Sequence, residues 1–248
     1  MWQLEQSVGR KGKNHPSDVV TVAGRLVMLG FTWVQKAKDT GVCDDTLIFT
    51  IKLFQSIVRG FDVVSTEVDG RVDPFGPTLA WLNAANAPAW RLMPVQGVGL
   101  RNDEAADRTD HHDWGTSWLA STALQAGCSY AQDFLRLHPD RAPIVLNDTS
   151  LATGGDTKDH AGHETGLAVD TKLPRLDGTA GGITWRDALY DREAMRAQLQ
   201  AWWKQPGVEI IYFNDPELIA EGLCHRSAGH DNHAHVEIKP PTRAMWVA

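Results

Sequence analysis

Apolar side chains in the first part of the chain recur every three or four positions, which places them on one face of a helix. Between residues 16 and 60 this series comprises Val19, Val22, Leu26, Leu29, Leu47, Ile48, Ile51 and Phe54. The polar residues Ser17 and Asp18 directly after Pro16 are typical of a helix start. We predict helices over residues 16–29 and 44–58, and a short third helix over 78–83.

The second part of the chain has a different pattern. A stretch rich in Pro and Gly at residues 83–99 is followed by a predicted helix over 114–137. Short apolar runs then predict strands, separated by helices at 191–204 and 216–223. These strands begin at Pro143, Gly166, Val208 and His233. We therefore predict an α+β protein with a small three-helix domain (residues 1–88) and a second domain built on a central antiparallel sheet (89–248).

Composition and charge exclude several classes of protein. The chain has 248 residues, of which 42% are hydrophobic and 22% charged, as in ordinary globular proteins. The net charge is −7 and no run of Lys or Arg reaches five, so we expect no nucleic-acid partner. No apolar run is long enough to cross a membrane, and the first residues lack the apolar core of a signal peptide. We expect synthesis in the cytoplasm without a signal peptide.

Histidines are the most informative residues. Five of the ten lie in two short windows, at His160, His163, His230, His233 and His235. His163 lies on the loop that leads into a predicted strand, and Asp170 lies on that strand. The imidazole and the carboxylate can therefore reach one point. His233 and His235 are two residues apart and would project from the same face of a strand. Two imidazoles and one carboxylate form a ligand set that zinc prefers, with one position left for water.

The additional histidines suit catalysis at such a site. Hydrolysis requires a base that takes a proton from water and a donor for the developing oxyanion, and imidazole serves either role near neutral pH. We expect His233 to act as the base and His230 to stabilise the oxyanion, although the two roles can be exchanged. His160 would contact the metal ligands rather than the metal itself. The alternative is a set of solvated histidines in glycine-rich loops that bind no metal.

The order H-x6-D and then H-x-H resembles the signature of the LAS metallopeptidases, and the finer spacing resembles the penicillin-insensitive murein endopeptidases among them. The words GLAVD, YFNDPELI and HVEI also fit this family. The resemblance covers residues 140–240 and implies a LAS-type metallopeptidase fold. It further implies zinc ligands at His163, Asp170 and His235, a histidine beside the attacking water at His233, and further active-site histidines at His230 and His160.

The N-terminal part resembles a different family. The runs IKLFQ (residues 51–55) and DGRVDPFGPTLAWL (69–82) are similar to those of the small peptidoglycan-binding module. Residues 63–67 are inserted relative to that pattern. The resemblance implies that the N-terminal helices hold the protein on the bacterial cell wall; the alternative is an accessory domain that binds nothing.

Together these resemblances imply a zinc-dependent murein endopeptidase that cuts peptide cross-links of peptidoglycan. It would reach the periplasmic wall after release, as a phage endolysin, or after delivery, as an antibacterial effector. An effector would require an inhibitor (immunity) protein as a partner. Two alternatives remain open: a D,D-carboxypeptidase or dipeptidase that acts on stem-peptide termini, and a wall-binding protein without activity.

Overall fold

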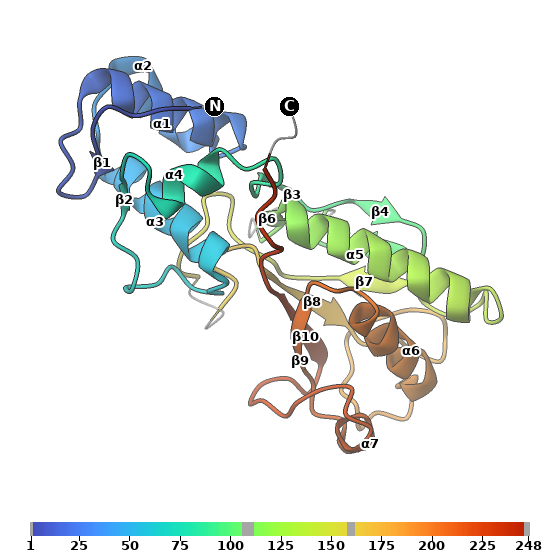
Figure 1. Cartoon of the computed structure of the whole chain (residues 1–248). Coiled ribbons are helices and arrows are strands. Elements are labelled where there is room, and N and C mark those ends of the chain that lie inside the picture. Colours follow the sequence, from blue (N-terminus) through green and yellow to red (C-terminus); the bar gives the residue numbers. More distant parts are fainter. Residues whose placement is uncertain (1, 106–111, 158–161, 246–248) are drawn as a thin grey trace.

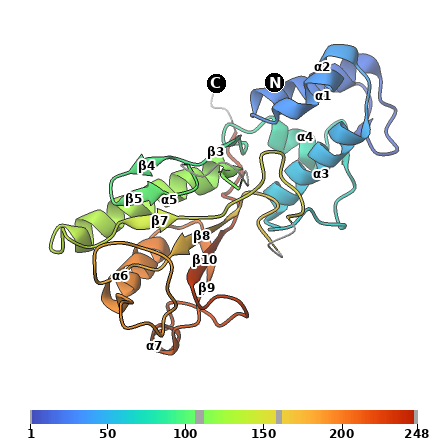
Figure 2. The same cartoon turned by 180° about the vertical axis from the view of Figure 1, so that it is seen from behind.

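The computed structural model describes residues 2–105, 112–157 and 162–245. The first helices gather at one end of the molecule, and a six-stranded sheet with the later helices forms the other end (Figures 1 and 2). The helical end holds α1 (Pro16–Met28), α2 (Gln35–Thr40), α3 (Asp45–Arg59) and α4 (Pro77–Leu82). The other end holds α5 (Ser117–Tyr130), α6 (Arg192–Trp203) and the short α7 (Pro216–Ala220). Within the described ranges, no helix combines the length and apolar character needed to cross a membrane.

The longest helix of the helical region, α3, begins and ends with ordinary local signals in the sequence. The side chain of Asp44 accepts from the amide of Leu47, which satisfies a free donor in the first turn of α3. Gly60 ends the helix in the left-handed conformation, with φ of 79°. A short ladder pairs β1 (Val8–Gly9) with β2 (Arg71–Val72) beside it.

Helix α2 and the 3₁₀ turn η1 (Thr32–Val34) were not predicted. The prediction of three helices in this region is therefore incomplete, since α2 adds a fourth. With six residues and only Ala37 fully buried, α2 is too short to show a helical period in the sequence.

The large sheet has the strand order β4-β5-β7-β8-β10-β9. Its strands are β4 (Gln96–Gly97), β5 (Leu100–Asn102), β7 (Ile144–Leu146), β8 (Ala168–Lys172), β9 (Val208–Tyr212) and β10 (His233–Ile238). All neighbouring pairs are antiparallel except β5 and β7, which are parallel. The predicted antiparallel sheet is therefore a mixed sheet. The chain between β5 and β7 includes α5, and a helical crossover of this kind allows two strands to run in the same direction.

Helices α5 and α6 contact each other and cover one face of the sheet. A π-helical turn (Ala131–Leu135) extends α5, and a small ladder of β3 (Trp90–Leu92) with β6 (Trp114–Thr116) precedes it. Val169, Ile211 and Val236, which lie on neighbouring strands, are fully buried. Because strand side chains alternate, the residues next to these three point to the opposite face of the sheet.

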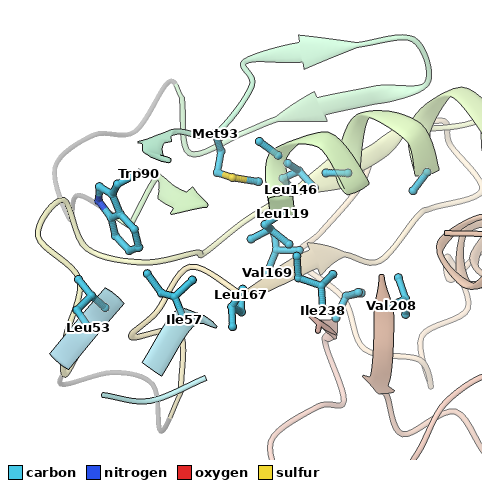
Figure 3. Close-up of a cluster of buried hydrophobic side chains, with 14 of the residues drawn as sticks. Leu53, Ile57, Trp90, Met93, Leu119, Leu146, Leu167, Val169, Val208 and Ile238 are labelled. Atoms are coloured by element: carbon cyan, nitrogen blue, oxygen red, sulfur yellow. The ribbon is translucent and has the colours of Figure 1, made fainter. Parts of the chain in front are cut away.

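A continuous hydrophobic cluster joins the helical end to the sheet. Figure 3 shows Leu53 and Ile57 of α3 on one side of this cluster, and Leu167 and Val169 farther along it. Trp90 stacks on Phe31 with ring centroids 5.8 Å apart, so an aromatic pair also crosses between the two parts. The shared core fixes the helical end against the strands that carry the predicted site.

Candidate metal centre

The pairing of three strands brings two predicted site residues, Asp170 and His235, into one row with Tyr212. In the antiparallel pair of β8 and β10, His235 lies directly opposite Asp170. On the other side of β10, Tyr212 of β9 lies opposite His235. Opposed residues share one face of a sheet, and this face is the one turned away from the buried Val169 and Val236. The strand register alone therefore places a carboxylate beside an imidazole.

His163 reaches the same point from the loop that precedes β8. Its backbone has a φ of 66°, the left-handed conformation that residues other than glycine rarely adopt. Such a conformation costs on the order of 1–3 kcal/mol and persists only where surrounding contacts enforce it. The hydroxyl of Ser150 donates to the carbonyl of His163 and supplies one such contact. Gly166 then turns the chain into β8, with φ of 66°.

The three predicted ligands converge. Their ligand atoms all lie within 4.8 Å of one another, and their side chains are buried. Oδ1 of Asp170 is 3.3 Å from Nε2 of His163 and 2.9 Å from Nδ1 of His235. Two imidazole nitrogens and one carboxylate oxygen thus face one point, and the group can hold a metal ion.

Electrostatics within this group suit a cation. Burial alone would raise the pKa of the Asp170 carboxyl, but hydrogen bonds with His163 and His235 hold it well below its ordinary value. Burial also opposes the charged form of His235, yet Asp170 and Glu237 raise its pKa to about 9. The carboxylates therefore stabilise positive charge at this imidazole. A bound metal ion would replace that proton as the positive partner of Asp170.

Glu237 lines the same cavity as the candidate ligands but was not predicted from the sequence. Its Oε1 lies 3.2 Å from Nε2 of His235, the ring nitrogen that does not face Asp170. Metal-binding histidines commonly donate their second ring nitrogen to a carboxylate, which orients the ring and raises its basicity. The signal was present, because residues 233, 235 and 237 alternate along β10 and share a face.

His233 and His230 lie beside the three candidate ligands. Nε2 of His233 lies 3.5 Å from Oδ2 of Asp170, and the rings of His230 and His233 are 4.8 Å apart. Burial lowers the pKa of both imidazoles. Both side chains line the cavity described below. His160, also predicted for the site, lies outside the described residues.

The group opens into a cavity of about 750 Å³. Strands, the loop at 227–233 and the loop before β8 form most of its wall. One residue comes from the helical region: Asp62, which follows α3. Burial and the nearby charge of Glu237 raise the pKa of the Asp62 carboxyl. No site residue was predicted in the helical region, so Asp62, like Glu237, is a cavity residue that was not predicted from the sequence.

Comparisons of the chain with protein-family models and with curated proteins found no match. The candidate centre is therefore defined by its own geometry: three buried nitrogen and oxygen donors at the wall of a cavity, with two further imidazoles beside them.

Proposed function

We propose that this protein is a zinc-dependent peptidoglycan hydrolase that cleaves the peptide cross-links of the bacterial cell wall. The observation that carries the proposal is the convergence of His163, Asp170 and His235 at a cavity that His230 and His233 also line. The similarity of this histidine pattern to the LAS metallopeptidases, and to the murein endopeptidases among them, supplies the substrate class. A LAS-type fold for residues 89–248 is part of the same proposal.

Zinc fits the donor set better than magnesium or calcium, and the similarity to the LAS metallopeptidases favours zinc over iron(II), which the same ligand set also binds. Magnesium and calcium prefer oxygen ligands, whereas two imidazoles and one carboxylate suit zinc. Three protein ligands leave a coordination position open, which is the arrangement of catalytic rather than structural zinc sites. When bound, zinc would polarise the scissile carbonyl and acidify a water molecule.

The remaining histidines supply the proton chemistry. A base must be largely neutral at the working pH, and burial lowers the pKa of His233 and so favours its neutral form. Its Nδ1 contacts the side-chain oxygen of Asn232 at 2.8 Å, which orients the ring and leaves Nε2 toward Asp170. We assign His233 as the base and His230 as the group that stabilises the oxyanion.

The helical region would hold the enzyme on its insoluble substrate. A second cavity of about 320 Å³ lies on this region, lined by charged and polar residues, by the apolar Val58, Val68 and Pro77, and by Trp81. The resemblance of residues 51–55 and 69–82 to the peptidoglycan-binding module supports wall binding. Tethering raises the local concentration of cross-links around the metal centre and compensates for weak binding in the cleft.

This activity places the protein at the periplasmic wall, either as a phage endolysin or as an antibacterial effector. An effector of this kind would need an inhibitor protein in the cell that makes it. Binding of a co-expressed candidate inhibitor over the 750 Å³ cavity would distinguish the second role from the first.

Digestion of purified sacculi tests the proposal. The wild-type protein loaded with zinc should convert cross-linked muropeptide dimers to monomers, as measured by mass spectrometry. His163→Ala and His235→Ala should abolish both bound zinc and cleavage, because each removes one of three ligands. His15→Ala is the matched control, since His15 is exposed on the helical region.

The products separate the candidate functions. Loss of terminal D-alanine with intact dimers would identify a carboxypeptidase, and unchanged sacculi would identify a wall-binding protein without activity. Zinc binding or cleavage that survives in either histidine variant would refute the metal centre.

A further inference from the structure

The segment that follows α3 packs directly on the loop that carries His163. We call residues Phe61–Val64 the clasp segment. The side chain of Thr165 donates to the carbonyl of Phe61 at 2.7 Å, and the amide of Glu164 donates to the carbonyl of Asp62 at 2.9 Å. The amide of Val64 donates to Oε2 of Glu164 at 2.7 Å. Three hydrogen bonds therefore join the helical region to the two residues directly after a metal ligand.

Glu164 is the centre of this arrangement. Its amide and its carboxylate both bind the clasp segment, while its carbonyl accepts from the amide of Gly155 at 2.9 Å. The bond from Val64 to the carboxylate is charge-assisted, which makes it stronger than a bond between neutral groups. Backbone and side chain of Glu164 are thus held from two directions.

The close approach of Asp62 shows how tightly the two parts fit. A Cβ atom added at Gly162 would lie 2.8 Å from Oδ2 of Asp62, so a larger residue at this position would have to displace the carboxylate. His163 stands between this glycine and Glu164, in the left-handed conformation. No strand pairing holds His163, in contrast to Asp170 and His235. The position of His163 therefore depends on the contacts of the residues on either side of it, together with those of Ser150 and Asp170.

We propose that Glu164 and Thr165 are positioning residues of the metal centre, through which the clasp segment of the helical region fixes His163 for metal binding. The proposal rests on the metal centre of the proposed function. It gives the helical region a second role beside wall attachment, because the clasp segment, together with Ser150, holds the loop that carries the third ligand. Val64, which makes one of these contacts, lies within residues 63–67, the insertion relative to the peptidoglycan-binding pattern.

Zinc affinity of the full-length protein tests the proposal, measured by competition with a chromophoric chelator. Glu164→Ala removes the acceptor of Val64 and should weaken zinc binding roughly tenfold, at the lower end of the range for residues that orient metal ligands. Glu164→Gln keeps an acceptor oxygen in the same place and should restore affinity to within about threefold of wild type. Glu209→Ala is the matched control, because Glu209 is exposed on β9, away from the clasp segment.

A second variant and a metal-free measurement complete the test. Thr165→Val removes the bond to Phe61 without a change of shape and should weaken zinc binding by a smaller factor. In the metal-free protein, hydrogen exchange of the backbone amide of residue 164 should be faster in the Glu164→Ala variant than in wild type or in the Glu209→Ala variant.

The outcomes separate this proposal from the proposed function. If wild type binds zinc, and Glu164→Ala and Thr165→Val bind it equally tightly, the positioning role is refuted and the hydrolase is not. If wild type and the variants bind zinc as expected but sacculi remain intact, the positioning role stands and the hydrolase is refuted. Wild type that binds no zinc refutes both.

Discussion

The three metal-ligand candidates are held in two different ways. Asp170 and His235 lie on paired strands, directly opposite each other, and the backbone ladder sets their separation. His163 lies on a loop, in a backbone conformation that is costly for histidine. The loop depends on side-chain contacts and on the helical region, whereas the strands depend mainly on each other. The site therefore has a rigid half, formed by Asp170 and His235 on the strands. The position of the other half, His163, depends on contacts from the helical region.

The difference extends to the outer contacts of each ligand. His235 is supported by Glu237, which lies two residues along the same strand. His163 is supported by Ser150 and, through Glu164, by a segment about 100 residues earlier in the chain. Support for the strand ligand is local, while support for the loop ligand is long-range.

Substitution of Gly166, which connects the loop to β8, has the largest expected effect on stability. A Cβ atom there would lie 2.7 Å from Cα of Gly115 and 2.9 Å from the ring of Trp90. Gly166→Ala should lower the free energy of unfolding by about 3 kcal/mol, measured by urea denaturation, since overpacking adds about 1–3 kcal/mol to the cost of a left-handed alanine.

Gly222→Ala is the control for this variant. Gly222 also has a positive φ, of 74°, but apart from Gly222 itself and its two chain neighbours, no atom of the described residues lies within 4 Å of its added Cβ. This variant should lose only about 1 kcal/mol, the cost of the backbone conformation. Equal losses of stability in the two variants would show that Gly166 is not tightly packed. The contrast between the loop that holds His163 and the strands that hold the other two candidates would then be weaker.

Glu237→Gln tests the rigid half of the centre. The substitution keeps the shape of the side chain but removes the charge that supports His235, so zinc affinity should fall roughly tenfold. Glu209→Gln, on the neighbouring strand, should leave the affinity unchanged. Chelator competition measures both. An unchanged affinity in Glu237→Gln would mean that the strand register alone orients His235.

The smallest effect is expected in the loop that carries His230. Asp231 accepts hydrogen bonds from Arg186, Asn214 and Trp185. The Arg186 guanidinium, together with these two other donors, lowers the pKa of the Asp231 carboxyl to about 2. A depressed pKa in the folded state stabilises the protein above the pKa of the unfolded chain, and this contribution is lost as the pH falls toward 2.

Asp231→Asn should therefore be slightly less stable than wild type at pH 7, and the difference should disappear between about pH 4 and pH 2. Thermal unfolding across this pH range measures the difference. The effect is small because the side chain is partly exposed and water screens its charge. A difference that stays constant to pH 2 would show that Asp231 acts through packing rather than charge.

Local patterns in the sequence were sufficient for much of the fold. The spacing of Val19, Val22 and Leu26 predicted α1, and the alternation from His233 predicted β10. The same alternation predicted that His233 and His235 share a face, because side-chain direction on a strand follows from residue parity. Short elements such as α2 lacked enough residues to show a period.

Other features depended on the tertiary structure. The sequence alone determined which side chains share a face of one strand. The spacing of its histidines, through the resemblance to the LAS metallopeptidases, predicted the candidate ligands His163, Asp170 and His235. Only the folded protein determined the register that puts His235 opposite Asp170, the parallel pairing of β5 with β7, and the contact of Val64 with Glu164. The physical reason is range: periodicity reports neighbours along one helix or strand, whereas these contacts join segments that come together only when the shared hydrophobic core forms.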